Sequence, residues 1–271
     1  MMQTPKKRSR FRIWCGTQYY RLRRYLLWYS GKYQFAAKRQ EASLPYEYIN
    51  HQTPLLRRLR GAQMYLQENK VKNLELAVKR INGIVIRPGE TFSYWKLIGK
   101  PTKRKGYLPG MELFCGQVRP GIGGGLCQLS NLIYWMALHS PLTVTERYRH
   151  GYDVFPDSNR VIPFGCGATC VYNYRDLMLK NETACSFQIK VWLDGKYLHG
   201  QICGEAKPSF TYEIYEREHY MQMELFGKYS RNNVIARRVY DLEGNQVDDE
   251  HITENHALMM YDPMIGEKQE V

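Results

Sequence analysis

Apolar positions recur at helical spacing in three parts of the chain. They fall every three to four residues within 19–29, 67–82 and 126–139, so each range is predicted to form a helix with one buried face. Ser140 and Pro141 follow the third range and end it, because a proline cannot continue the helix and restricts the residue before it.

Downstream of the third helix the pattern becomes strand-like. The ranges 144–155, 169–179 and 187–202 are rich in Val, Tyr and Ile, and Asp194-Gly195 divides the last of them as a hairpin turn would. We therefore predict the α+β class, with a mixed or antiparallel sheet packed against the third helix and a β-rich C-terminal part.

The formal net charge of +13 is concentrated at the N-terminus. Residues 1–39 hold 11 of the 39 Lys and Arg and no acidic residue, whereas the remaining residues carry 28 basic and 26 acidic side chains. Aromatic residues interleave with arginines in YYRLRRYLLWYSGKY, a composition typical of a helix on an anionic membrane surface. Docking on the chain's own domain or on a protein partner is an equally weighted alternative. Nucleic-acid binding is not expected, because no recognisable nucleic-acid module follows.

Three parts are therefore predicted along the chain. Residues 1–40 form a basic amphipathic segment, residues 41–205 the main domain, and residues 206–271 a β-rich C-terminal extension. Seven scattered cysteines, no signal peptide and apolar runs too short for a bilayer indicate reduced thiols. The expected location is cytoplasmic, with peripheral attachment to the inner membrane face as the corollary of the membrane hypothesis.

A glycine-rich stretch, GIGGGLCQ, precedes the third helix and delivers Cys127 to its start. Glycines permit close backbone approach, so Gly123, Gly124 and Gly125 can direct several N–H groups at one spot, with Gln128 beside them as a further ligand-binding or oxyanion-binding group. A helix N-terminus favours thiolate over thiol, so Cys127 is the candidate nucleophile. P-loop and dinucleotide-binding patterns both fail here, because Leu126 and Cys127 replace the residues they require.

A nucleophilic cysteine needs a base and a group that orients the base. His150 is the best candidate base, in a strand-like segment after the Cys127 helix. Asp176 is the candidate third catalytic residue, with Asp153 and Glu146 as alternatives.

Two other interpretations of these residues stay open. A cysteine is more often structural than catalytic, and a glycine run can serve only a tight backbone crossing. Zinc binding by Cys166 and Cys170 with Cys115, Cys127 or His150 is less favoured, because residues four apart on a strand lie about 13 Å from each other. We therefore predict neither a metal nor a cofactor.

Four segments resemble the VanW family, and most closely its short branch. They are residues 74–99, 121–135, 145–156 and 165–181, and the GGGLCQ core with the later ERYRH is the specific part. Many longer members carry an aspartate at the position of Gly167. Where that aspartate orients a catalytic histidine in those members, the resemblance implies that this chain uses another group or has lost the activity.

The resemblance implies a function in glycopeptide resistance, and vancomycin resistance in particular, or in cell-wall metabolism of a Gram-positive bacterium. It implies a peptidoglycan precursor or stem peptide as the partner, but no particular reaction. A Cys-dependent acyl-transfer or amide-hydrolysing enzyme is the leading hypothesis. A non-catalytic precursor-binding protein or a membrane-associated adaptor is the alternative.

Overall fold

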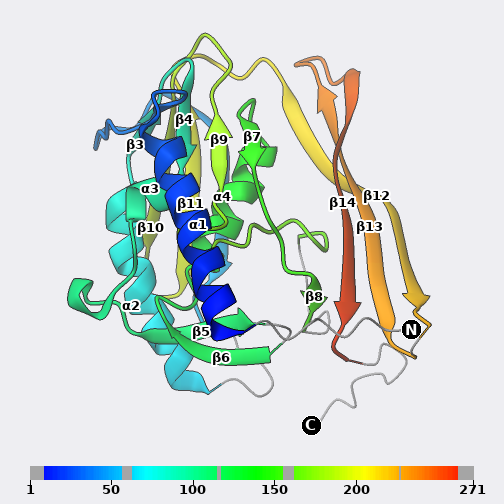
Figure 1. The fold of residues 1–271 in the computed structure, drawn as a ribbon. Coiled ribbons are helices and arrows are strands. Elements are labelled where there is room, and N and C mark those ends of the chain that lie inside the picture. Colours follow the sequence, from blue (N-terminus) through cyan, green and yellow to red (C-terminus); the bar gives the residue numbers. More distant parts are fainter. Residues whose placement is uncertain (1–8, 57–62, 115–116, 155–161, 226, 262–271) are drawn as a thin grey trace.

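The computed structural model of the protein describes residues 9–56, 63–114, 117–154, 162–225 and 227–261. The chain folds into helices and several β-sheets, and every element after the last helix is a strand, so the predicted α+β class is confirmed (Figure 1).

The helices match the three predicted ranges, with one short addition. They are α1 (Arg10–Tyr29), α2 (Met64–Ile81), α3 (Tyr94–Ile98) and α4 (Cys127–Leu138). α1 begins earlier than the apolar period suggests, because Ser9 caps it by accepting a hydrogen bond from the Arg12 N–H.

Two four-stranded sheets frame the main domain. The first is antiparallel, in the order β2 (Tyr46–Pro54), β11 (Tyr197–Gly204), β10 (Phe187–Leu193), β3 (Ile84–Ile86). The second is mixed, in the order β1 (Gln34–Phe35), β4 (Glu90–Ser93), β9 (Met178–Lys180), β7 (Thr143–Glu146).

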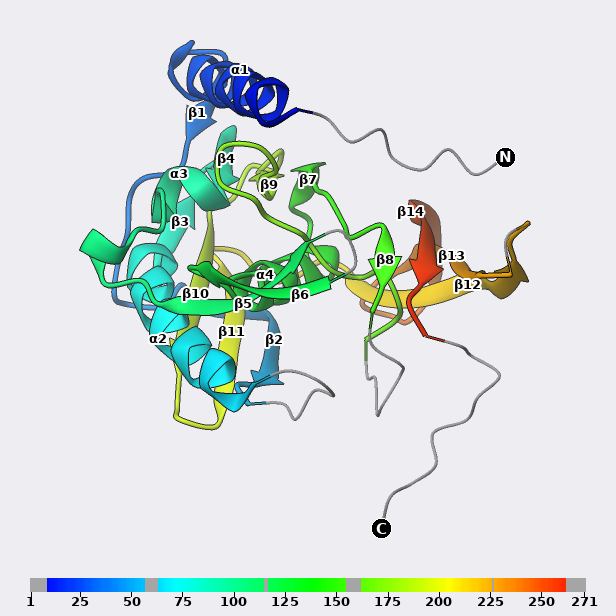
Figure 2. The same cartoon turned by 60° about the horizontal axis from the view of Figure 1, so that its bottom comes forward.

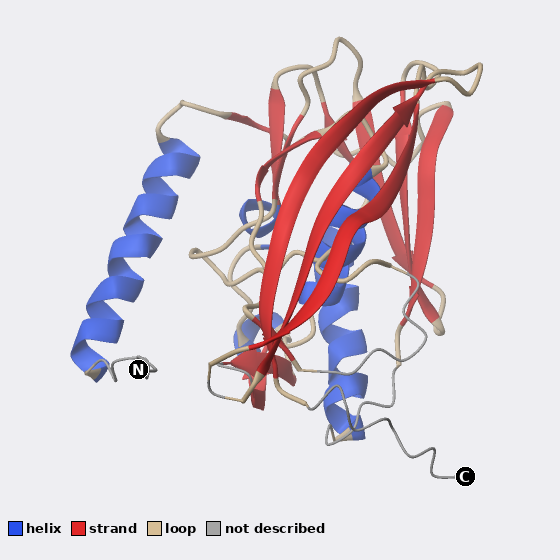
Figure 3. Cartoon of the chain, turned by 90° about the vertical axis from the view of Figure 1, so that its right-hand side faces the viewer, coloured by secondary structure: helices blue, strands red, loops and turns tan. Residues whose placement is uncertain are grey.

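The C-terminal part adds a third sheet at one side of the molecule (Figure 1). It contains β12 (Thr211–Met223), β13 (Tyr229–Tyr240), β14 (Gln246–Met259) and the short β8 (Tyr152–Asp153). The main domain also carries a hairpin of β5 (Pro109–Phe114) and β6 (Gln117–Ile122). Figure 3 shows the long strands of the third sheet in front, with α1 standing apart at one side.

The core forms where α4 lies against β2 and β11. The predicted apolar stripe of α4 is fully buried at Leu129, Leu132, Ile133 and Met136. Gly200 of β11 allows this close approach, because a Cβ there would lie 2.6 Å from the Met136 side chain.

The C-terminal sheet is tied to the same core. Ile235 of β13 belongs to the buried apolar cluster, and the Arg237 guanidinium donates to the carbonyl oxygens of Leu138 and Ser140 at 3.0 and 3.1 Å. These bonds satisfy carbonyl groups at the end of α4, which would otherwise lack partners.

Two of the predicted strands are largely irregular. Within 144–155 only β7 and β8 form, and within 169–179 only β9 does. Asn173 is the physical reason in the second range, because its φ of 56° lies in the left-handed region and turns the chain between Val171 and Arg175. The predicted hairpin at Asp194-Gly195 forms as expected between β10 and β11.

Candidate functional site

The glycine-rich stretch forms a turn that ends at Cys127, the first residue of α4. Gly123 and Gly125 have φ values of 80° and 89°, a conformation that L side chains rarely adopt. A Cβ on Gly124 would collide with the backbone of Gly110, and one on Gly125 with the Lys70 side chain. Close packing therefore accounts for these glycines whether or not a ligand binds the turn.

Three N–H groups of the turn have no backbone acceptor among the described residues. The Gly123 N–H donates to Leu108 O at 3.0 Å, and the Gly124 N–H donates to Gly121 O at 2.9 Å. Among the described residues, no hydrogen bond uses the N–H groups that follow, those of Gly125, Leu126 and Cys127. The expected N–H cluster is thus shifted toward the cysteine.

Gln128 is occupied by the sheet beneath it. Its side-chain amide donates to Thr53 Oγ1 and Pro54 O, both at 2.9 Å. These bonds fix the first turn of α4 to the end of β2, and they use the two donors that a ligand would need.

The Cys127 thiol is half-buried and points at the loop that leads to β9. Its Sγ contacts Cys170 O at 3.9 Å. Burial raises the pKa of the Cys127 thiol, the hydrogen bond with Cys170 acts in the opposite direction, and the negative charge of Glu112 raises it further. The resting group is therefore a thiol, in contrast to the thiolate that the helix N-terminus alone favours.

His150 lies in the irregular segment between β7 and β8. Burial lowers the pKa of its imidazole, and the positive charge of Arg175 lowers it further, so the ring is neutral near pH 7. None of the hydrogen bonds among the described residues joins the His150 ring to Cys127 or Asp176. The structure therefore does not bring the three predicted catalytic residues into one hydrogen-bonded chain.

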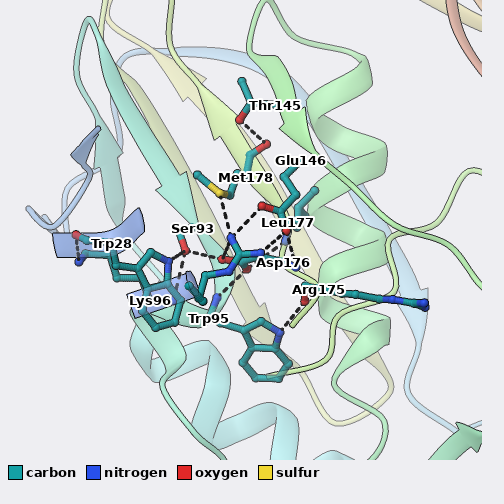
Figure 4. A network of polar contacts seen from close by, with 11 residues as sticks. Trp28, Ser93, Trp95, Lys96, Thr145, Glu146, Arg175, Asp176, Leu177 and Met178 are labelled. Carbon is teal, nitrogen blue, oxygen red and sulfur yellow. Dashed lines mark hydrogen bonds and ion pairs between the residues drawn. The ribbon is translucent and has the colours of Figure 1, made fainter. Parts of the chain in front are cut away.

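Asp176 is instead the centre of a buried network at the second sheet (Figure 4). Its Oδ2 accepts from Ser93 Oγ at 2.5 Å and its Oδ1 accepts from the Trp95 N–H at 2.9 Å. Ser93 Oγ in turn accepts from Trp28 Nε1 of α1 at 3.1 Å. Arg24 of the same helix lies 3.9 Å from the Asp176 carboxylate.

Burial raises the pKa of Asp176 to about 6, although the hydrogen bonds from Ser93 and Trp95 and the positive charge of Arg24 oppose this shift. Glu146, one of the two alternatives to Asp176, receives both guanidinium nitrogens of Arg24. The network therefore serves the attachment of α1 to the main domain.

Asp153, the other alternative, lies in the third sheet. It accepts a hydrogen bond from the Tyr261 hydroxyl at 2.8 Å and lies 3.7 Å from the Arg231 guanidinium. It therefore helps to join β8 to the C-terminal strands.

Several residues around the site carried no strong sequence signal. Arg24 is one of five arginines in an aromatic helix, and nothing in the sequence separates it from exposed Arg23. Glu112 did carry a signal in the sequence, because Glu112 and Glu146 are the two acidic residues between Glu90 and Arg147. The described residues contain no group of three or more His, Cys, Asp or Glu side chains placed to hold a metal ion.

Gly167, at the family's acidic position, packs against α4. A Cβ there would lie 2.9 Å from Asn131 Oδ1, and this oxygen accepts from the Ala168 N–H at 2.7 Å. The Arg147 guanidinium holds the same loop by donating to the carbonyl oxygens of Gly165 and Gly167. Arg147 and Asn131 thus hold the backbone of this loop, and a side chain at residue 167 would require Asn131 to move.

No helix among the described residues combines the length and apolar character that crossing a bilayer requires.

Comparison with known proteins covers the region that contains this site. Residues 69–203 match the family model described as VanW like protein. The vancomycin B-type resistance protein VanW of Enterococcus faecalis (strain ATCC 700802 / V583) is 40% identical over 174 residues, which are 64% of this chain and 63% of that protein. The uncharacterized protein YoaR of Bacillus subtilis (strain 168) is 30% identical over 115 residues, 42% of this chain and 36% of that protein.

The matched regions thus span less than two thirds of both relatives. No solved structure gives a significant match. The family model covers the glycine turn, α4 and the loops around Cys127, and the enterococcal relative matches as well. The chain therefore belongs to the VanW family.

Proposed function

We propose that this protein is an accessory protein of vancomycin resistance and cell-wall metabolism that acts on peptidoglycan precursors. The name of the enterococcal relative supports the resistance context. The proposal of a reaction rests on the position of Cys127. This residue lies at the start of α4, beside three N–H groups that donate to no described acceptor.

The proposed reaction is acyl transfer or amide hydrolysis. The Cys127 sulfur attacks the carbonyl carbon of an amide or ester, a C–S bond forms, and the C–N or C–O bond breaks as the leaving group takes a proton. The N–H groups of Gly125, Leu126 and Cys127 stabilise the oxyanion. Water or an acceptor amine then releases the acyl group from the sulfur.

The thiol proton needs an acceptor, and two groups are candidates. His150 is neutral and so able to take a proton, as a base must be. Glu112 is the second candidate, because its charge acts on the Cys127 thiol. Asp176 has no direct part in this scheme, because its hydrogen bonds go to Ser93, the Trp95 backbone and its own chain neighbour.

The test compares Cys127→Ala and Cys127→Ser with the parent chain in a strain that requires the protein for vancomycin resistance. Both variants are expected to lose resistance and precursor turnover while melting at the parent temperature. Retained resistance in Cys127→Ala would refute the enzymatic proposal.

A second candidate is a non-catalytic precursor-binding protein, and the raised pKa of the Cys127 thiol favours it. A ligand carboxylate would then occupy the N–H groups at the start of α4. In this case Cys127→Ser leaves resistance unchanged, so the same pair of variants separates the two candidates.

α1 supports a location at an anionic membrane surface. Its Phe11, Trp14, Tyr19 and Leu22 side chains are mostly exposed, and basic residues lie between them. Apolar rings among cations suit the interface of an anionic bilayer. The same surface is available to the protein partners that an adaptor would need, so vesicle binding is the direct test.

A further inference from the structure

Asn173 is a buried side chain with neither end of its carboxamide satisfied. The residue is 1% exposed, and both Nδ2 and Oδ1 lack a hydrogen-bond partner. Buried polar groups are nearly always paired, so an amide with two unmet ends indicates that a partner is missing from the site. Its left-handed backbone, with φ of 56°, holds the side chain in this place.

Two tyrosine hydroxyl groups face the same carboxamide. Tyr25 of α1 and Tyr172 lie with their hydroxyl oxygens 3.2 Å apart. The pKa of Tyr25 is lowered, mainly by its hydrogen bond with Tyr172, and also by the Asn173 carboxamide and the positive charges of Arg21 and Lys100. The carboxamide is therefore near both hydroxyls, although it forms no hydrogen bond of full geometry with either.

The charge around this spot is positive. Arg21 Nε is buried and has no hydrogen-bond partner, and the charged groups that act on Tyr25 are the cations Arg21 and Lys100. Neither cation forms an ion pair with a carboxylate among the described residues. An anionic group would therefore be attracted to the space between α1 and the loop before β9.

α1 packs against this loop through aromatic rings, on the side of the main domain where β4 and β9 lie (Figure 2). The Tyr20 and Tyr174 rings meet edge to face at 4.8 Å, and the Trp28 and Tyr172 rings lie 6.5 Å apart. A hollow along α1 includes Arg21 and Tyr25 in its lining, which consists of residues of the helix itself.

We propose that α1 and residues 171–175 enclose a subsite for the carboxyl terminus of a short peptide, whose carboxylate is bound by Arg21 and Lys100 and whose last amide pairs with Asn173. The unpaired Asn173 Oδ1 favours a peptide ligand over a phosphate ligand. A phosphate diester offers no donor to this oxygen, whereas a peptide N–H does, and the peptide carbonyl accepts from Nδ2.

The subsite adjoins the region of Cys127. The loop that carries Asn173 also carries the Cys170 carbonyl, which contacts the Cys127 thiol. Lys100 is followed by Pro101, against which Gly123 of the glycine turn packs. The subsite rests on the proposed function for its substrate class, since a peptidoglycan stem peptide has amides and a carboxyl terminus.

The test is calorimetric titration of the full chain carrying Cys127→Ala, so that binding is measured without chemistry. The probes are N-acetyl-Ala-Ala as the free acid, the same peptide as its C-terminal amide, and inorganic phosphate. The acid is expected to bind at least about tenfold more tightly than the amide, because only the acid can pair with Arg21 and Lys100.

Two pairs of variants locate the site. Arg21→Gln should weaken binding of the acid at least about tenfold, whereas Arg23→Gln, an exposed neighbour on α1, should leave it unchanged. Asn173→Gly keeps the left-handed backbone accessible and removes the carboxamide, so it should weaken binding, and Asn173→Asp should weaken it more by repelling the carboxylate. Thermal melting of each variant confirms that it is folded.

Equal binding of acid and amide, equal effects of Arg21→Gln and Arg23→Gln, or unchanged affinity in Asn173→Gly would each overturn the subsite. Phosphate binding that exceeds peptide binding would overturn it in favour of a lipid or phosphate site. These outcomes do not depend on the enzymatic proposal. If only the enzymatic proposal is wrong, the peptide still binds the Cys127→Ala variant.

Discussion

Arg24 of α1 and Glu146 of β7 form a bidentate ion pair, although they are 122 positions apart in the chain. Arg24 is buried and Glu146 nearly so, and the same guanidinium lies close to Asp176. The basic N-terminal helix is therefore attached to the main domain through one of its cations, while its aromatic side chains other than Trp28 remain exposed. Membrane binding and docking on its own domain, posed as alternatives for this segment, are thus compatible.

Loss of the Arg24 cation should destabilise the protein strongly. Arg24→Gln leaves the Glu146 and Asp176 carboxylates without their cation, which costs about 3 kcal/mol of unfolding free energy for a largely buried pair. Chemical denaturation measures the loss, and Arg23→Gln, an exposed matched control, should change stability by less than about 0.5 kcal/mol. Equal stabilities of the two variants would contradict the attachment of α1 through Arg24.

Asp176 should make the stability of the protein fall as pH rises toward neutrality. Its pKa is raised from 3.8 to about 6 by burial, so the folded state keeps a proton that the unfolded state releases. The stabilising contribution is therefore complete below pH 3.8 and is lost as pH rises through about 6.

Asp176→Asn removes this titration, so its melting temperature should depend less on pH between 4 and 7 than that of the parent. Asp249→Asn is the control, because Asp249 is exposed and its pKa is lowered, mainly by its hydrogen bonds with Tyr215. An unchanged pH profile in Asp176→Asn would show that the carboxyl group is ionised throughout.

The glycine turn should tolerate no side chain at Gly124. A methyl group there meets the backbone of Gly110, so Gly124→Ala is expected to cost at least about 2 kcal/mol of unfolding free energy. Gly16→Ala is the matched control, because nothing lies within 4 Å of the added methyl group and alanine favours the helix by about 1 kcal/mol. Denaturant titration of both variants checks the prediction, which fails if Gly124→Ala is as stable as the parent.

Sequence patterns predicted the parts of this fold that depend on local spacing. The apolar stripe of α4 and its start at Cys127 follow from the helical period and the preceding glycines, and the hairpin at Asp194-Gly195 follows from its turn residues. The irregular loop at 169–177 was wrongly predicted as strand, because its Val and Tyr content is typical of strands while the left-handed Asn173 breaks the pairing.

The surroundings of the site depend on contacts between distant residues, which no local pattern encodes. Asp176 was a sound candidate as an acid after the Cys127 helix, but its partners Ser93 and Arg24 come from 83 positions away and from another helix. Likewise, the helix start favours a thiolate at Cys127, whereas burial, a tertiary property, acts against it.

Cys127 should react more slowly with alkylating reagents than an exposed cysteine. Burial raises the pKa of its thiol, whereas Cys15 on α1 is exposed. Alkylation of the native protein at pH 7, mapped by mass spectrometry, should label Cys15 first, and Cys127 labelling should increase as pH approaches 9. Labelling of Cys127 ahead of Cys15 at pH 7 would instead indicate a thiolate stabilised by the start of α4.

α1 should bind vesicles that contain anionic lipid and not vesicles of neutral lipid alone. Phe11 and Trp14 are 74% and 59% exposed near the start of the helix, and their rings stack at 6.2 Å. Replacing both with serine removes apolar area from the face that enters the interface, so affinity measured by co-sedimentation should fall at least about tenfold.

Tyr220→Ser is the matched control, since this ring is 52% exposed on β12, away from α1, and its loss should leave vesicle binding unchanged. Added salt should weaken the binding of the parent chain, because the arginines of α1 supply the electrostatic part of the attraction. An equal loss of vesicle affinity in the two variants would contradict an interfacial α1. Binding that depends on neither anionic lipid nor salt would contradict it as well. Binding that depends on salt but not on Phe11 and Trp14 would restrict the contact to the basic side chains and contradict insertion of the rings.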